Sequence, residues 1–242
     1  LGAASGGGIN QAVSLVGGQV KSYQFTVPVG TASMEVRLDN RVGNPIMSLI
    51  SGGRIPQPGI TSPNYSYYGY DGGQYSAKPG AVSRLYEDNL ITLANPPSGT
   101  YSLAVRAEAV GSDYPDATCN LVIRQVPRVP LNFAASLNGN GQSHTATRQL
   151  LDTQKDFFEI AVPNTLGADP VIGWLIKVNN LQGDTTLRIY KTWGNPGTGI
   201  TVSGNTALVV PPFLTPGDTW FIEVTGTGLT NYTITSLPVT LE

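Results

Sequence analysis

The chain has 242 residues, enough for two domains of ordinary size that each bury a hydrophobic core. Charged residues make up 12% of the sequence and the formal net charge is -2 at pH 7, so no basic surface is expected to neutralise phosphates. We therefore expect no nucleic acid and no anionic membrane as partner, and favour an uncharged polymer. No apolar run reaches the length that spans a bilayer, so membrane insertion is not expected.

The polar residues are mostly Ser, Thr, Asn and Gln, beside 29 glycines and 18 prolines. This composition is more typical of an exported bacterial surface protein than of a cytosolic enzyme. We expect a secreted or cell-surface protein, from which any signal peptide has been removed before Leu1. The single cysteine, Cys119, lies in a strand-like segment and is expected to be a small buried hydrophobic residue.

Alternation of apolar and polar residues with a period of two predicts β-strands along the whole chain, whereas helical spacing is almost absent. The first clear examples are residues 23–27 and 34–38, and a later one is residues 103–105. Gly-Gly and Pro-Gly pairs between such segments predict turns. Short strands punctuated in this way indicate an all-β fold with antiparallel sheets packed face to face.

A long insertion separates the strand at Leu49 from the strand at residues 90–93. Loops of this length without secondary structure are uncommon unless they have a function. Tyrosine rings can stack on sugar faces or on proline-rich peptide and still form hydrogen bonds at their edges. The alternative is that the rings fold back and cover the sandwich or the face between domains. The residues predicted to bind a ligand are Tyr65, Tyr67, Tyr68, Tyr70 and Tyr75, with Trp193 as their counterpart in a shorter loop of the second half.

The junction between the two halves is the segment 125–130, in which Pro127 and Pro130 favour an extended, semi-rigid connector. We predict one domain over residues 1–126, with the tyrosine-rich insertion, and a second domain of the same type over residues 131–242.

An internal repeat supports this division. Residues 23–28 match residues 158–163, and residues 36–40 match residues 176–180. Further along, Gly43 matches Gly183, and the closing strand at 99–105 matches 217–224. The sequence therefore predicts two tandem antiparallel β-sandwiches that are jelly-roll-like. The predicted cores contain Phe25, Val36, Leu38, Leu103 and Val105 in the first, and Ile160, Ile176, Val178, Ile222 and Val224 in the second.

The repeated blocks resemble the bacterial pre-peptidase C-terminal (PPC) domain family. The matching motifs are the strands that end in Val-Pro (23–28 and 158–163), the Gly-Asp-Thr-Thr-Leu-Arg-Ile segment at 183–189, and the closing strand at 99–105. The resemblance implies β-sandwich accessory domains of exported hydrolases, without catalysis of their own, and related modules bind polymers. The first copy departs from the family pattern, because Asn44 stands where Asp184 stands in the second copy.

Catalytic chemistry is not predicted. His144 is the only histidine, and its neighbour Ser143 would point to the opposite face of a strand. One cysteine and one histidine cannot supply a structural zinc site. The paired acidic residues fall in turn-like segments and in no recognisable motif. We therefore expect that the protein is not an enzyme and requires no cofactor.

Calcium is the one metal that the sequence leaves open, because it needs only oxygen ligands gathered on loops. The candidate ligands are Asn179, Asn180 and Asp184, which lie at the ends of predicted strands. The alternative is that these side chains satisfy the backbone of turns.

Two functions follow from these features. The first is a non-catalytic accessory module of an exported bacterial protein, which binds an extended polysaccharide, a protein polymer or a cell surface. The second is a structural surface-layer, filament or adhesin subunit that associates with itself through exposed strand edges.

Overall fold

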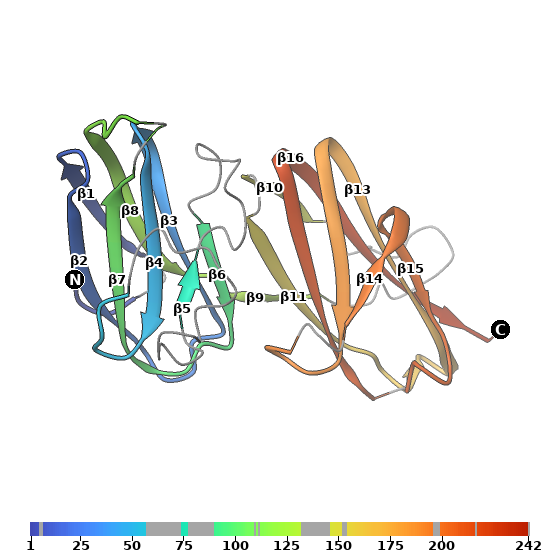
Figure 1. Ribbon diagram of the computed structural model, residues 1–242. Helices are drawn as coiled ribbons and strands as arrows, with labels where there is room; N and C mark the ends of the chain where they lie inside the picture. Colours follow the sequence, from blue (N-terminus) through green and yellow to red (C-terminus); the bar gives the residue numbers. More distant parts are fainter. Residues whose placement is uncertain are drawn as a thin grey trace. The chain divides into compact units, whose positions relative to one another are not determined.

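The computed structural model describes residues 1–4, 7–56, 74–76, 90–108, 110, 112–131, 146–151, 154–195, 199–215 and 217–241. The described residues form β-strands and one short 3₁₀ turn at Ser203–Asn205, which confirms the all-β prediction. No helix in this part of the chain could cross a membrane. The chain divides into two compact units, Leu1–Pro127 and Arg128–Glu242 (Figure 1).

The first unit is a sandwich of two four-stranded antiparallel sheets, in the orders β1-β8-β3-β6 and β2-β7-β4-β5. Eight strands connected in this order form a jelly roll. The strands are β1 (Ile9–Leu15), β2 (Val20–Val27), β3 (Ser33–Val42), β4 (Pro45–Ser51), β5 (Gln74–Ser76), β6 (Leu90–Ala94), β7 (Gly99–Ala107) and β8 (Ala117–Gln125).

The second unit contains two strands of 22 residues, β13 and β16, which pair with each other along most of their length. The first half of β16 also pairs with β11, and its second half pairs with β10. In the same way β13 pairs with β15 near its start and with β14 near its end. The strands are β9 (Arg128–Pro130), β10 (Ala146–Leu150), β11 (Lys155–Ala161), β12 (Thr165–Leu166), β13 (Asp169–Tyr190), β14 (Ile200–Val202), β15 (Thr206–Val209) and β16 (Thr219–Thr240).

The two units share one topology. The first half of β13 occupies the place of β3 and its second half that of β4, while β16 corresponds to β7 followed by β8. The order β11-β16-β13-β14 then corresponds to β2-β7-β4-β5, and β10-β16-β13-β15 corresponds to β1-β8-β3-β6. Two pairs of strands that are separate in the first unit, β3 with β4 and β7 with β8, are therefore each one continuous strand in the second.

The segment with the two prolines is part of a sheet in the second unit. Residues Arg128–Pro130 form β9, which runs parallel to β11 at the edge of its sheet. Proline is tolerated at such a position because an edge strand has one side that needs no hydrogen bond from its N–H groups.

A glycine stands at the corner where the chain passes from one sheet to the other. Gly43 lies between β3 and β4, and Gly183 lies within β13 beside an irregularity in its pairing with β16. Both have a positive φ, 71° and 66°. A Cβ atom would lie 2.3 Å from the carbonyl oxygen of Asp116 at the first corner and 2.6 Å from that of Leu229 at the second. Only glycine fits this approach without displacing the neighbouring backbone.

Each unit has its own hydrophobic core between its sheets. All ten residues predicted for the two cores are buried in the corresponding clusters. Trp174 of β13 and Trp220 of β16 are also buried. Cys119 is 4% exposed, and burial raises the pKa of its thiol to about 11, so the thiol stays protonated and unreactive at neutral pH.

One buried polar network crosses the second sandwich. The carboxylate of Asp156 on β11 accepts two hydrogen bonds from Arg148 on β10, at 3.1 and 2.7 Å, and one from the Tyr232 hydroxyl at 2.6 Å. Burial and the adjacent Asp156 charge raise the pKa of Tyr232, which stays protonated as the donor. Since β10 and β11 pair with different halves of β16, the network ties together two strands that do not pair with each other.

We predict that Gly183→Ala lowers the free energy of unfolding of the second unit by about 3 kcal/mol, from a strained φ and a backbone clash. Gly167→Ala is the matched control, because Gly167 has a φ of +64° and nothing within 4 Å of its missing Cβ. Gly167→Ala should lower the free energy of unfolding by about 1 kcal/mol, because it introduces the strained φ without the clash. Denaturant unfolding measures both, and equal losses would show that the corner can relax.

Candidate functional site

The tyrosine-rich loop lies mostly outside the described residues. Tyr65, Tyr67, Tyr68 and Tyr70 lie outside the described residues. For Tyr75 the backbone alone is described, in β5, where it pairs with Leu49 of β4. Among the predicted ligand-binding residues, Trp193 is thus the one whose side-chain contacts the structure describes.

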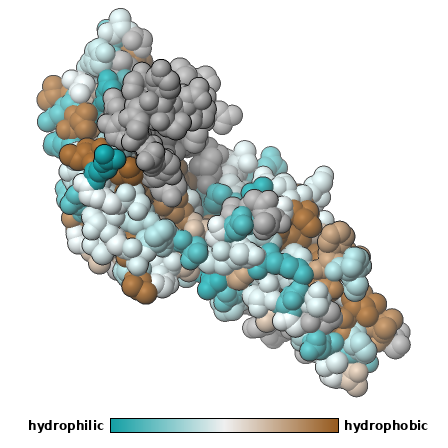
Figure 2. All heavy atoms as spheres, turned by 60° about the horizontal axis from the view of Figure 1, so that its bottom comes forward, coloured by the Kyte–Doolittle hydropathy of each residue, from teal (hydrophilic) through white to brown (hydrophobic). Residues whose placement is uncertain are grey.

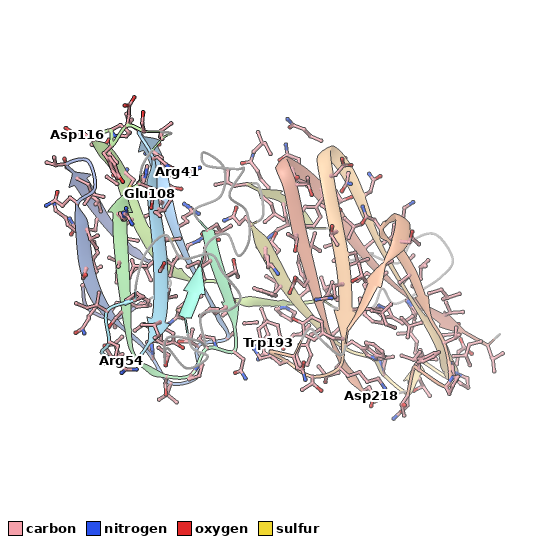
Figure 3. The ribbon with its side chains drawn as sticks, viewed as in Figure 1. Arg41, Arg54, Glu108, Asp116, Trp193 and Asp218 are labelled. Atoms are coloured by element: carbon pink, nitrogen blue, oxygen red, sulfur yellow. The ribbon has the colours of Figure 1, made fainter. Side chains whose placement is uncertain are left out.

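Trp193 lies in the turn after β13 and is half-buried (Figure 3). Its ring makes an edge contact with Phe157, with centroids 5.2 Å apart, and a tilted contact with Phe221 at 5.4 Å. It stacks on Tyr190 with an interplanar angle of 20° and centroids 6.2 Å apart. We call these four side chains, Phe157, Tyr190, Trp193 and Phe221, the aromatic face.

The aromatic face lies on the outer side of a sheet. On β11 the side chain of Phe158 joins the core, so its neighbour Phe157 points to the opposite side. The same alternation turns Phe221 of β16 and Tyr190 of β13 outward, and these two residues are directly opposite each other in the ladder. The outer side of an antiparallel sheet is usually polar, yet Phe157 and Tyr190 are each 1% exposed.

Charged side chains surround the rings. The guanidinium of Arg128 lies 4.8 Å from the ring centroid of Trp193 and 5.4 Å from that of Phe221, and it pairs with Glu159 at 3.2 Å. Lys155 pairs with Glu223 at 2.5 Å on the same side of the sheet. Cation–π contacts and ion pairs thus hold the rings and their rim in a defined arrangement.

The hydroxyl of Tyr190 is the unusual group of this site. It is buried and has no hydrogen-bond partner among the described residues. Burial raises its pKa, the charge of Glu223 raises it further, and Arg128 and Arg188 partly offset this effect. The hydroxyl therefore stays protonated, and it can donate one hydrogen bond and accept another. Buried hydroxyls without a partner are uncommon in proteins.

The aromatic face offers groups that can bind a ligand. Its rings provide apolar contact area, and the Tyr190 hydroxyl and the ion pairs provide polar groups at the edge. In the described part of the chain, no three His, Cys, Asp or Glu residues come together to hold a metal ion. His144 lies outside the described residues.

Sequence reasoning singled out Trp193 as a candidate but did not identify the residues that its ring contacts, Arg128, Phe157, Tyr190 and Phe221. The available signal was two adjacent apolar residues within one strand, as in Phe157-Phe158 and Phe221-Ile222. Adjacent side chains on a strand point to opposite sides, so one of each pair must lie outside the core.

The predicted calcium ligands lie around the corner of β13. Asn179 and Asp184 are exposed and Asn180 is half-buried. The side-chain oxygen of Asn180 accepts a hydrogen bond from the Thr185 hydroxyl at 2.7 Å, and that hydroxyl accepts one from Asn205 at 2.9 Å. Neither of these hydrogen bonds connects Asn180 to Asn179 or to Asp184. Both bonds join side chains, so neither is a bond from an Asx side chain to the backbone of a turn.

Comparison with known proteins gives no family for this chain. No protein-family model and no curated protein sequence matches it. Among solved structures, it is similar to the CUB1-EGF-CUB2 domains of rat MASP-1, with 4% identity, 96% of this chain and 99% of that chain covered, and a TM-score of 0.25.

Two streptococcal proteins give similar values. The serine-rich repeat protein Srr2 of Streptococcus agalactiae has 9% identity and a TM-score of 0.23, with 100% of this chain and 95% of that chain covered. The Endo-D glycoside hydrolase domain of Streptococcus pneumoniae R6 has 14% identity and a TM-score of 0.22, with 96% of this chain and 33% of that chain covered. At TM-scores this low, the similarities say nothing about the function of this chain.

Chelator titration separates the two interpretations of the β13 corner. A calcium ion bound only by the folded state would raise the thermal midpoint, and EDTA would lower it. Because the Asn180 oxygen is already a hydrogen-bond acceptor, we expect EDTA and added calcium to leave the melting curve unchanged. A midpoint that rises with calcium in the wild type and not in Asp184→Asn would establish the metal site instead.

Proposed function

We propose that this chain is a non-catalytic accessory module of an exported protein, secreted or held at the cell surface, that binds an extended polysaccharide or peptide through the aromatic face. The observation that carries the proposal is the buried Tyr190 hydroxyl without a partner, set among outward-facing rings. The resemblance of the repeated blocks to PPC domains agrees with an accessory role.

A flat ligand ring would stack on Trp193. The Arg128 guanidinium occupies one position over this ring, but it is 30% exposed and is held by Glu159 at the surface. A sugar or prolyl ring that displaces it gains stacking contact, while Arg128 keeps its ion pair and can donate to a ligand oxygen. The Tyr190 hydroxyl beneath gains the hydrogen bond that it lacks. Neutral ligands suit this site because its nearby charges are already paired.

The decisive variant is Tyr190→Phe, which removes the hydroxyl and keeps the ring. It should not destabilise the fold, because a buried hydroxyl without a partner contributes nothing favourable. It should weaken binding of soluble oligosaccharides or proline-rich peptides by about tenfold, the value of one hydrogen bond. Tryptophan fluorescence titration and affinity electrophoresis measure this loss, and thermal melting measures stability.

Trp193→Ala should weaken binding by at least as much, and Tyr114→Ala is its control. Tyr114 is 58% exposed and lies in the first unit, outside the aromatic face, so its removal should leave binding unchanged. A Tyr190→Phe protein that binds every tested polymer like the wild type, or a wild type that binds none, would reject the proposed site.

Self-association is the second candidate, and one surface of the second unit favours it. On the outer side of the sheet, Leu208 of β15, Leu175 of β13 and Leu237 of β16 are directly opposite one another. Leu208 is 57% exposed, and Val210 and Phe213 beside it are 41% and 66% exposed. Figure 2 shows hydrophobic atoms gathered on the second unit, on the side where Figure 1 places β15. Apolar patches of this kind often mark interfaces.

The expected partner at this surface is a second copy. Among the described residues β15 pairs only with β13, so its other edge is available for antiparallel pairing about a twofold axis. This candidate predicts dimers that form with rising concentration and disappear in Leu208→Lys. Val29→Lys in the first unit is the control, since Val29 is 89% exposed and outside the patch. Sedimentation velocity measures dimer formation, and a wild type that remains monomeric excludes self-association at this surface.

A further inference from the structure

A second polar group without a partner lies beside the aromatic face, on Arg188 of β13. Its neighbours Leu187 and Ile189 belong to the core, so the Arg188 side chain points to the outer side of the sheet, as Tyr190 does. Arg188 is half-buried, and its Nε is buried with no hydrogen-bond partner among the described residues. None of the ion pairs in this part of the chain includes its guanidinium. Arg188 therefore has unused hydrogen-bond donors at the surface of the sheet.

Arg188 belongs to a row of residues that crosses the sheet. In the ladder it is directly opposite Glu223 of β16 on one side and Thr201 of β14 on the other. Beyond Glu223 the row continues to Phe157 of the aromatic face. Thr201 is exposed, and its neighbour Val202 packs against the core, so Thr201 also points outward. Figure 1 shows β16, β13 and β14 side by side, so the row leads from the aromatic face across the sheet to β14.

The carboxylate of Glu223 does not satisfy Arg188. It accepts a hydrogen bond from Lys155 at 2.5 Å instead. Its charge still acts on this row, because burial raises the pKa of Tyr190 and Glu223 raises it further, while the Arg188 charge acts in the opposite direction. Glu223 thus offsets part of the Arg188 charge. A neutral oxygen can therefore serve as the acceptor that Arg188 lacks.

The two groups without partners favour a saccharide over a peptide. Tyr190 and Arg188 lie two residues apart on one strand, and residues so spaced are about 7 Å apart. The tyrosine hydroxyl can donate or accept, whereas the guanidinium only donates. A sugar carries hydroxyl groups on the ring itself, so a ring held by stacking has oxygens at its edge that bond in both senses. A proline-rich peptide has no N–H at its prolines and offers only carbonyl oxygens there.

We propose that Arg188 and Thr201 form a second subsite for the ligand of the aromatic face, and that this ligand is a polysaccharide. The inference rests on the proposed function, because it places the next sugar of the same ligand beside the one that stacks on Trp193. Arg188 donates charge-assisted hydrogen bonds to hydroxyl oxygens of that next sugar, and the Thr201 hydroxyl donates or accepts one more. The polysaccharide then crosses the sheet from the aromatic face toward β14.

Ligand length tests the second subsite. The probes are the mono- and tetrasaccharides of cellulose and of mannan, with an acetylated, amidated oligoproline as the peptide. On the wild type the tetrasaccharide should bind about tenfold more tightly than the monosaccharide, the value of one hydrogen bond to a charged group. Arg188→Met keeps an apolar side chain of similar length and should lose this gain, while its affinity for the monosaccharide stays unchanged. Titration followed by NMR measures both affinities.

Lys177→Met is the matched control. Lys177 is exposed and lies in the half of β13 that pairs with β15, so this variant removes a positive charge from the same strand but away from the row. The gain should persist in it. An unchanged gain in a folded Arg188→Met protein overturns the subsite. If Arg188→Met does not fold, Thr201→Val takes its place and should reduce the gain about threefold, the value of one hydrogen bond between neutral groups. An unreduced gain there has the same meaning.

The outcomes also separate this inference from the proposed function. If the wild type binds the peptide but no saccharide, and Tyr190→Phe weakens that binding, the aromatic face is a binding site and the assignment to polysaccharide is wrong. If the saccharides bind and Tyr190→Phe weakens them, but greater length brings no gain, the second subsite is wrong. A wild type that binds none of the probes overturns both proposals.

Discussion

The passage of the chain from one sheet to the other is the constraint on which both units depend. At Gly43 and Gly183 the backbone passes so close to a carbonyl oxygen on a neighbouring segment that there is no room for a Cβ atom. Because the turn is this tight, the strands on its two sides face each other across the core. Ile176 before the corner and Leu187 after it then contribute to the same hydrophobic cluster.

The fold was predictable from the sequence because its main signals are local. The alternation at residues 23–27 and 103–105 identifies which side of a strand is buried, and the structure places Phe25, Leu103 and Val105 in the core. The repeat of Gly43 at Gly183 has a direct physical reason, since both corners exclude a Cβ atom. The parallel strand β9 was harder to predict from the sequence, because prolines are compatible both with an extended connector and with an edge strand.

The candidate site was only partly predictable. Trp193 stands out in the sequence as an aromatic residue in a loop, but the position of its ring depends on which residues of three strands lie opposite one another. The ladder places Phe221 between Glu159 and Tyr190, and this register is set by pairing across distant parts of the chain. The absence of a partner for the Tyr190 hydroxyl is likewise a property of its three-dimensional surroundings.

The continuity of β13 and β16 has a consequence for how the second unit opens. Each of these strands belongs to both sheets, so separating either sheet must disturb the ladder that holds the other. In the first unit the corresponding strands are separate elements. Local opening should therefore be more restricted in the second unit, which would behave as one cooperative unit, or foldon, in which the two sheets are protected together.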